Sequence, residues 1–264
     1  MIAFTKMHGL GNDFMVFEAA EGLALPSTTT WRALADRHTG IGFDQALVIS
    51  EPLSAGVDAR YRIFNADGSE VEQCGNGARC VAEWLRLQGR ARDGLLLEST
   101  GGVVQARFPA AGQVAIDMGE PRFAEPAETS LILDGREIHY TSLSLGNPHI
   151  VLEVASVAEV PVATVGPALE SHPNFPARTN VGFLQIIDAD HALLRVYERG
   201  VGETRACGTG ACAAMATGRR AGRFNETVTI TLPGGALQIS WEGIGSHLWM
   251  SGPATVAFQG FVEV

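Results

Sequence analysis

Two of the four cysteines, Cys74 and Cys207, stand in nearly the same local sequence, half a chain apart. Cys74–Ala78 has the sequence CGNGA and Cys207–Ala211 has the sequence CGTGA. After each cysteine, apolar or small residues recur at helical spacing, which predicts that each cysteine begins a helix. A thiol at a helix start lies in the partial positive charge of unsatisfied N–H groups, which lowers its pKa and favours the thiolate. The sequence therefore predicts two reactive thiols in matched surroundings.

Two such thiols can perform acid–base chemistry on one carbon atom. A base on one face removes a proton, and an acid on the other face returns one, so the configuration is inverted. Negative charge then develops on a carboxylate next to the reacting carbon. The glycines after each cysteine leave the helix-start amides open to that carboxylate. The pattern favours inversion at the α-carbon of an amino acid, with the thiols facing each other across a cleft.

Other interpretations of the cysteines compete with this one. An isolated cysteine is usually a small buried hydrophobic side chain, and we assign that role to Cys80 and Cys212. A zinc site is disfavoured because no Cys-x-x-Cys or His-x-x-x-His spacing occurs. Gly208–Ala213 imitates a dinucleotide fingerprint, but no acidic residue closes a following strand. A non-enzymatic amino-acid binding protein would not need matched thiols, and a redox protein usually holds both in one short motif.

Further matches along the chain predict an internal duplication that would position the two cysteines in the same way. Within each half, alternating apolar runs predict strands around the cysteine helix, and Gly89 is expected to end the first helix. The predicted strands are Ala59–Phe64, Val103–Phe108 and Val114–Met118, then His191–Tyr197, Ala236–Trp241 and His247–Met250. The matched pairs are Gly11–Asn12 with Gly146–Asn147, Gly42–Gln45 with Gly182–Gln185, Glu70 with Glu203, Gly101–Gly102 with Gly234–Gly235, Gln105 with Gln238, and Met118 with Met250.

These features predict a mixed α/β (α+β) fold of two pseudo-symmetric domains. Each domain would be a mixed sheet around one principal helix, with the active site in the cleft between them. A chain of 264 residues is long for one domain and comfortable for two. The expected domains are residues 1–118 and 119–264, and a C-terminal strand near residues 254–264 can pack back onto the first.

Composition excludes several partners. The net charge of -10 is spread along the chain without a cluster of Lys and Arg, which argues against nucleic acid. Met1–Gly9 lacks the apolar region of a signal peptide. The longest uncharged stretch, Gly243–Val262, is interrupted by glycine and proline and does not indicate a membrane span. The cysteines are therefore expected to be reduced thiols in the cytoplasm.

Several longer strings resemble a single enzyme family. They are GNDF at Gly11–Phe14, GIGFDQ at Gly40–Gln45, NADGS at Asn65–Ser69, CGNGAR at Cys74–Arg79, GNPH at Gly146–His149, NVGF at Asn180–Phe183, and ERG at Glu198–Gly200 before CGTGA at Cys207–Ala211. These strings span nearly the whole chain. Together they resemble the diaminopimelate epimerases.

The resemblance implies a cofactor-independent isomerase that interconverts L,L- and meso-diaminopimelate, without pyridoxal phosphate or metal, on the route to lysine and peptidoglycan. It implies that Cys74 and Cys207 are the acid–base pair, supported by His149 and Glu198. The amides of Gly75, Asn76, Gly208 and Thr209 would hold the reacting carboxylate, and Glu198 with the Arg199 region would hold the reacting ammonium. The side chains implied for the rest of the substrate are Asn12, Gln45, Asn65, Asn147, Asn180 and Arg199. The expected partner is this small molecule, and a homodimer is the assembly considered.

Each implied residue also has a simpler explanation. Asn147 and Asn180 could serve turn chemistry, Gln45 could be a solvated strand end, and His149 could be structural. Proline and hydroxyproline racemases also use two cysteines and form an alternative assignment. They would be expected to carry His at the position of Asn76, so Asn76 favours diaminopimelate.

Overall fold

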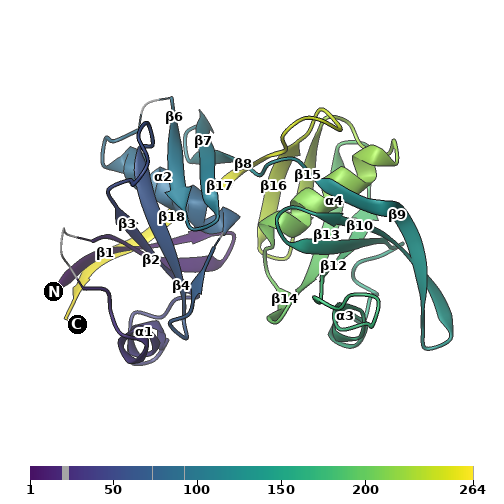
Figure 1. Ribbon diagram of the computed structural model, residues 1–264, viewed down its shortest axis with the longest axis horizontal. Helices are drawn as coiled ribbons and strands as arrows, with labels where there is room; N and C mark the ends of the chain where they lie inside the picture. The colour runs from purple at the N-terminus through teal and green to yellow at the C-terminus, as the bar shows by residue number, and fades with distance from the viewer. Residues whose placement is uncertain (20–23, 73, 92, 264) are drawn as a thin grey trace. The chain divides into compact units, whose positions relative to one another are not determined.

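The computed structural model describes residues 1–19, 24–72, 74–91 and 93–263, which fold into two compact units. Unit 1 consists of Met1–Ile116 and Gly252–Val264, and unit 2 consists of Asp117–Ser251. The chain passes from one unit to the other twice, within strands β8 (Gln113–Asp117) and β17 (Trp249–Pro253). Both units combine strands with helices, which confirms the predicted mixed α+β class (Figure 1).

In its described residues, unit 1 combines two helices with a mixed sheet. The elements are β1 (Ile2–Gly9), β2 (Asn12–Glu18), α1 (Thr28–Ala35), β3 (Gln45–Ser50), β4 (Ala59–Asn65), β5 (Glu70–Val71), α2 (Gly75–Leu87), β6 (Gly94–Ser99), β7 (Gly102–Ala110), most of β8, and β18 (Thr255–Val262). The parallel pairs β2–β3 and β4–β6 are joined by crossovers that contain α1 and α2. The pairs β1–β2, β1–β18, β3–β4, β4–β5, β6–β7 and β7–β8 are antiparallel.

Unit 2 repeats this order, except that β9, the equivalent of β18, comes first rather than last. Its elements are β9 (Arg122–Leu133), β10 (Arg136–Ser144), β11 (Pro148–Glu153), α3 (Val162–Glu170), β12 (Asn180–Ile186), β13 (His191–Glu198), β14 (Gly202–Thr204), α4 (Gly208–Arg220), β15 (Thr227–Leu232), β16 (Gly235–Ser240) and most of β17. The pairs β11–β12 and β13–β15 are parallel, as are β2–β3 and β4–β6 in unit 1. Strand β9 pairs with β10 as β18 pairs with β1. The duplication predicted from the cysteine motifs therefore extends to the strand pairing.

Matching ion pairs support the duplication. Glu70 lies opposite Phe64, and its carboxylate binds the guanidinium of Arg62 through two hydrogen bonds of 2.7 and 2.6 Å. In unit 2, Glu203 lies opposite Tyr197 and binds Arg195 through two bonds of 2.6 and 3.0 Å. The predicted match of Glu70 with Glu203 is confirmed.

Two of the predicted matches are wrong. Gln45 begins β3 opposite Phe14, and the residue in that position of unit 2 is Asn180, which begins β12 opposite His149. Gln185 lies near the far end of β12. The match of Met118 with Met250 is also wrong. Ile116 pairs with Ala106 of β7, and Met250 pairs with Ile239, the equivalent residue of β16. Met250 therefore corresponds to Ile116. An irregularity of β7 after Arg107 makes sequence offsets unreliable near β8.

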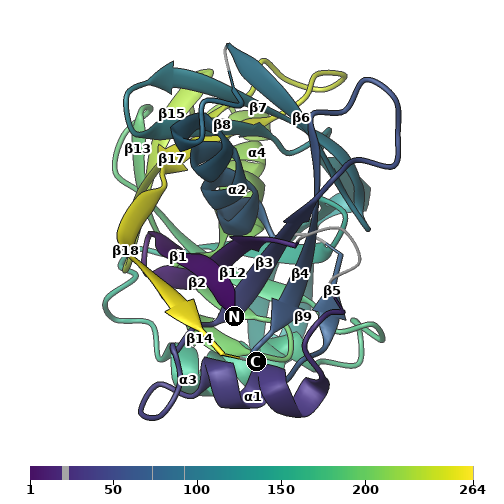
Figure 2. The same ribbon diagram turned by 90° about the vertical axis from the view of Figure 1, so that its left-hand side faces the viewer.

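The principal helix of each unit is enclosed by strands. All residues of α2 from Asn76 to Glu83 are buried, and α2 contacts β1, β2, β3, β6 and β7 (Figure 2). Helix α4 contacts β10–β13, β15 and β16, and its buried residues are mostly Gly and Ala. Small side chains allow strands to approach a helix closely on several sides. The predicted burial of Cys80 and Cys212 is confirmed.

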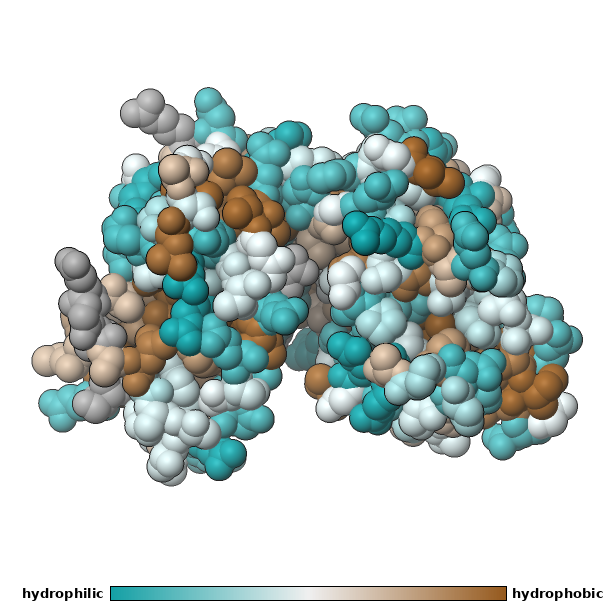
Figure 3. Space-filling model, viewed as in Figure 1, coloured by the Kyte–Doolittle hydropathy of each residue, from teal (hydrophilic) through white to brown (hydrophobic). Residues whose placement is uncertain are grey.

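Hydrophilic residues prevail on the face that Figure 3 shows, and apolar residues form small separate patches on each unit. None of the helices in the described part of the chain is long and apolar enough to cross a membrane.

Replacing Gly218 by Ala in α4 should destabilise unit 2. Alanine favours a helix by about 1 kcal/mol relative to glycine. A Cβ at Gly218 would, however, lie 2.2 Å from a ring carbon of Phe224. Relieving such an overlap costs about 1 to 3 kcal/mol, so the free energy of unfolding in urea should fall. The double variant Gly218→Ala, Phe224→Leu should recover part of the loss, and a stabilised Gly218→Ala protein would contradict the enclosed packing.

Candidate active site

Cys74 is the N-cap residue of α2, as predicted. Its backbone is extended (φ -150°, ψ 108°), and its sulfur accepts a hydrogen bond from the N–H of Gly77 at 3.3 Å. The first N–H groups of a helix have no partner within it. The amides of Gly75 and Asn76 therefore form a start that suits an anionic group.

Asn12 lies next to this helix start. Its carbonyl Oδ1 accepts a hydrogen bond from Asn76 Nδ2 at 3.3 Å and from the Cys74 thiol at a longer 3.8 Å. Its Nδ2 donates to Asp44 Oδ2 at 2.9 Å. The Oδ1 atom of the buried Asn76 has no hydrogen-bond partner among the residues that the structure describes. Unit 1 therefore places Asn12, Cys74 and Asn76 together, and Asn76 retains acceptor capacity.

A charged network holds the loop that carries Asn12. Lys6 and Arg37 both bind the carboxylate of Asp13, and Arg37 also binds Asp44 at 2.7 Å. These two cations keep the pKa of Asp13 well below its ordinary value, although partial burial acts to raise it. The network fixes Asp44, which in turn orients the amide of Asn12.

Gln45 and Asn65 form a second polar pair in unit 1. They lie opposite each other on β3 and β4, and Gln45 Nε2 donates to Asn65 Oδ1 at 3.0 Å. Within the described part of the chain, the buried Oε1 atom of Gln45 has no hydrogen-bond partner. The pair can therefore accept a further hydrogen bond.

Cys207 is the N-cap residue of α4 and is buried. Its thiol donates to Glu198 Oε2 at 3.0 Å, and Thr204 Oγ1 donates to Glu198 Oε1 at 2.5 Å. The end of β13 and the start of α4 thus bring a thiol and a carboxylate into direct contact. A carboxylate in this position can accept the proton of the thiol.

The remaining predicted residues of unit 2 lie in two connected groups. In the first group, Asn147 Oδ1 bonds with His149 Nε2 at 3.0 Å, and Asn147 Nδ2 donates to Thr209 Oγ1 at 3.4 Å. The same Thr209 hydroxyl lies 3.7 Å from the Cys207 sulfur. The other group joins Asn180 to Arg199, whose backbone N–H donates to Asn180 Oδ1 at 3.0 Å.

Asn12 and Asn147 occupy equivalent positions but present opposite ends of their amides to the helix start. The carboxylate of Asp44 can only accept hydrogen bonds, so Asn12 donates to it through Nδ2. The carbonyl oxygen of Asn12 is therefore directed to Asn76 and Cys74. In unit 2 the carbonyl of Asn147 is bonded to His149, and its Nδ2 is directed to Thr209. The two helix starts therefore share a scaffold and differ in the polarity of the group beside them.

The pKa of Cys207 is raised well above its ordinary value, which is opposite to the effect predicted from the helix start. Burial is the largest cause, followed by the charge of Glu198 and the hydrogen bond to it. The N–H of Gly210 and the hydroxyl of Thr209 lower the pKa, as predicted, but burial and Glu198 outweigh them. Cys207 is therefore a thiol until its proton passes to another group.

His149 is buried, and its pKa is lowered to about 3 by burial and by the charge of Arg199. The imidazole is therefore neutral at physiological pH and acts as a hydrogen-bonding group for Asn147 rather than as a cation.

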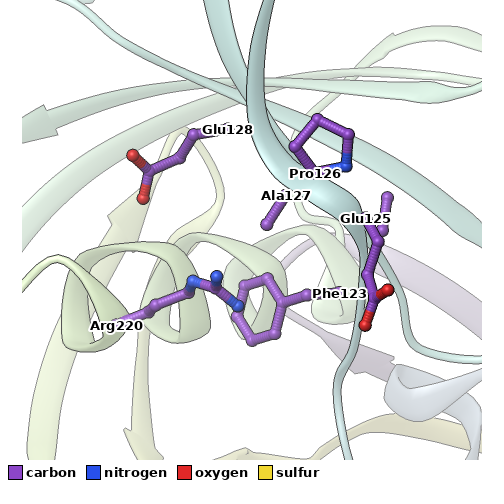
Figure 4. A pocket seen from close by; sticks show the side chains of 7 residues that line it. Phe123, Glu125, Pro126, Ala127, Glu128 and Arg220 are labelled. Atoms are coloured by element: carbon purple, nitrogen blue, oxygen red, sulfur yellow. The ribbon is translucent and has the colours of Figure 1, made fainter.

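A surface hollow of about 360 Å³ lies elsewhere on unit 2. Its lining includes Arg220, whose guanidinium stacks over the ring of Phe123 at 4.6 Å (Figure 4). Arg220 ends α4, whereas Cys207 precedes its first residue, so the helix separates the hollow from the cysteine by roughly 20 Å. The hollow does not contribute to the site.

Comparison with known proteins decides the family. A family model described as diaminopimelate epimerase matches residues 4–124 and 141–257. The chain belongs to the diaminopimelate epimerase family. Over the full length of both chains it is 48% identical to the diaminopimelate epimerase of Stutzerimonas stutzeri and 49% identical to that of Azotobacter vinelandii.

Solved structures share the fold of this family member at low sequence identity. A predicted epimerase from Pseudomonas aeruginosa superimposes with a TM-score of 0.72 at 15% identity, with all of both chains covered. A hydroxyproline epimerase from Agrobacterium vitis gives a TM-score of 0.71 at 16% identity, covering 98% of this chain and 91% of the other. Both are consistent with the duplicated two-domain architecture.

In this diaminopimelate epimerase family member, the sequence reasoning missed the groups that support the site. Asp13, Asp44, Lys6 and Arg37 are spread over loops and strands, and their contacts join residues distant in sequence. Asp13 and Asp44 do occur within the quoted family strings, which was the available signal.

Replacing Glu198 by Gln should make the Cys207 thiol more acidic, because a negative charge that disfavours the thiolate is removed. We expect alkylation of Cys207 by iodoacetamide, followed by mass spectrometry, to have its pH midpoint at lower pH and to be several-fold faster near pH 8. Glu203→Gln, on the same hairpin but paired with Arg195, is the control and should leave the midpoint unchanged. An unchanged or higher midpoint in Glu198→Gln would show that Glu198 does not control this thiol.

Proposed function

We propose that this chain catalyses the epimerisation of L,L-diaminopimelate to meso-diaminopimelate, a step of lysine and peptidoglycan precursor biosynthesis, through Cys74 and Cys207. Full-length identity of 48% to named diaminopimelate epimerases supports the activity. The observation that carries the mechanism is that each repeat begins its enclosed helix at one of these cysteines.

Inversion requires two proton transfers at the same α-carbon. One sulfur, as thiolate, takes the α-proton, so a C–H bond breaks and an S–H bond forms. The other thiol gives its proton to the opposite face, so its S–H bond breaks and a C–H bond of inverted configuration forms. We propose that Glu198 takes the proton of Cys207 when that cysteine acts as the base, a role that its 3.0 Å contact supports.

The helix-start amides would stabilise the charge that develops between these transfers. We propose that Gly75, Asn76, Gly208 and Thr209 direct their N–H groups to the reacting carboxylate. One such donor typically contributes about 3 to 4 kcal/mol to the stabilisation of a transition state. A neutral His149 suits this arrangement because it orders Asn147 without adding a competing positive charge.

We further propose that the remaining polar side chains bind the substrate. Glu198 with the Arg199 region would bind the reacting ammonium, and the distal end carries both an ammonium and a carboxylate. Amide side chains supply donors and acceptors for such a zwitterion, and Gln45 and Asn76 retain unbonded acceptor atoms. The residues proposed for the substrate beyond its reacting centre are Asn12, Gln45, Asn65, Asn147, Asn180 and Arg199.

We propose a cytoplasmic location and a homodimer. All four cysteines are thiols rather than disulfides, which suits a reducing compartment. Strand β18 exposes Phe258 and Phe261, which are 49% and 75% accessible. Aromatic side chains are enriched at subunit interfaces, and two-fold dimers are the commonest assembly of soluble oligomers.

The dimer can be tested by replacing Phe261 with Lys. We expect the wild-type protein to sediment as a dimer in analytical ultracentrifugation and the variant to dissociate, because a desolvated ammonium in an interface is unfavourable. Ile244→Lys, at an equally exposed apolar position of unit 2, is the control and should stay dimeric. A wild-type monomer, or an equal effect of both substitutions, would count against β18 as the interface.

The function is tested with L,L-diaminopimelate in deuterated water. The wild-type enzyme should form meso product that carries α-deuterium. Cys74→Ala and Cys207→Ala should each lose about 10²- to 10⁴-fold in epimerisation, because inversion then lacks its acid or its base. Each should retain slow α-exchange without inversion, catalysed by the surviving thiol, and the two variants should prefer opposite configurations.

Mass spectrometry and chiral chromatography measure these outcomes after circular dichroism has confirmed folding. Cys212→Ala, which removes a buried thiol from α4, should remain active. A non-enzymatic binding protein or a redox protein would show no α-exchange at all. If either cysteine variant inverts near the wild-type rate, or both prefer the same configuration, one cysteine does not serve each face.

A further inference from the structure

The carboxylate of Glu170, at the end of α3, is buried and fully engaged. Glu170 is 1% exposed. Its Oε1 accepts the backbone N–H of Gly200 at 2.7 Å, and its Oε2 accepts from the guanidinium of Arg178 at 2.5 Å. A buried carboxylate is very unfavourable unless it is paired and hydrogen-bonded, and both conditions are met here.

The two partners belong to segments that carry residues of the candidate site. Gly200 lies in the turn between β13 and β14, two residues after Glu198. Arg178 lies two residues before Asn180, at the entry to β12. Glu170 therefore ties the turn after the carboxylate that contacts Cys207 to the segment before Asn180.

Side chains hold consecutive N–H groups of this turn. The N–H of Arg199 donates to Asn180 Oδ1 at 3.0 Å, and that of the next residue, Gly200, donates to Glu170. The Arg199 side chain also donates to the carbonyl of Ala177 at 3.3 Å. Two contacts thus join the turn directly to residues 177–180, and the carboxylate of Glu170 adds a third link because it binds both Gly200 and Arg178.

The described residues of unit 1 lack this arrangement. The last residue of α1 is Ala35, where α3 ends with Glu170. The turn after Asn65 is instead held by backbone bonds, from the N–H of Ala66 to the carbonyl of Asp44 at 3.1 Å and from that of Gly68 to the carbonyl of Asn65 at 2.9 Å. The side chains that bond within it, Asn65 and Asp67, belong to the turn itself and bind Ser69. The anchoring carboxylate occurs in the repeat whose strand ends in Glu198 rather than Asn65.

We propose that Glu170 is a positioning residue, which fixes the turn after β13 through the N–H of Gly200 and so keeps the Glu198 carboxylate at the Cys207 thiol. Its effect on turnover rests on the proposed epimerase function. The anchoring of the turn does not, and it can be measured separately.

The experiment compares Glu170→Ala with Glu170→Gln. Gln keeps an acceptor for Gly200 and loses the charge, whereas Ala loses both. We expect Glu170→Ala to exchange the amides of the 198–204 segment faster in hydrogen-exchange mass spectrometry and to lose about 10- to 100-fold in kcat, because small displacements of a catalytic group are costly. Glu170→Gln should retain most of the protection and of kcat, although the melting temperature of both variants should fall.

Arg178→Met gives a second comparison, since it removes the ion pair and leaves the carboxylate on Gly200; it should keep kcat within a few-fold. Glu83→Ala is the matched control, because Glu83 is a buried glutamate of α2 that binds Arg86 at 2.6 Å. It should lose stability and keep kcat.

Equal kcat in Glu170→Ala and wild type, or unchanged exchange in the 198–204 segment, would overturn the proposal. Absence of wild-type turnover would refute the proposed function instead, while the exchange comparison would still decide the anchoring.

Discussion

A helix enclosed by strands must pack closely on almost every side, and this constraint governs both units. In α2 the residues from Asn76 to Glu83 are all buried, and α4 meets the same demand with glycines and alanines. Such a helix can neither rotate nor slide without disrupting a close-packed interior. Its first turn is therefore fixed in its unit, together with the cysteine that caps it. The precise position of the sulfur therefore depends on the packing of helix residues that lie far from it in the chain.

On this duplicated scaffold, the polar groups around the two cysteines have diverged. Asn12 and Asn147 share a position but turn opposite ends of their amides toward the helix start. Strand β4 ends in Asn65 where β13 ends in Glu198. The carboxylate, ammonium and side chain of an α-carbon follow one another in opposite order when seen from its two faces, so two identical environments could not match both faces. The repeat supplies the common geometry, and its divergence gives each helix start different polar neighbours.

The sequence was sufficient to predict the features that are local. Cysteines before glycine-rich helix starts and alternating apolar strands depend on a few neighbouring residues, and both were found as predicted. Pairing Gln45 with Gln185 failed because similar letters do not fix strand register, which depends on the partner strand. The raised pKa of Cys207 comes first from its burial in the folded unit, and the bond between Glu170 and Gly200 joins residues 30 positions apart, so no local pattern could reveal either.

The pairing of β18 with β1 has a consequence for how the protein is made. Residues near the two termini form adjacent strands of unit 1, while unit 2 is continuous in sequence. During synthesis, domains fold as units from the N-terminus onward. Here the order is reversed, because one of the two partner strands of β1 is synthesised after the whole of unit 2. Unit 2 can therefore complete its fold on the nascent chain before unit 1 receives β18.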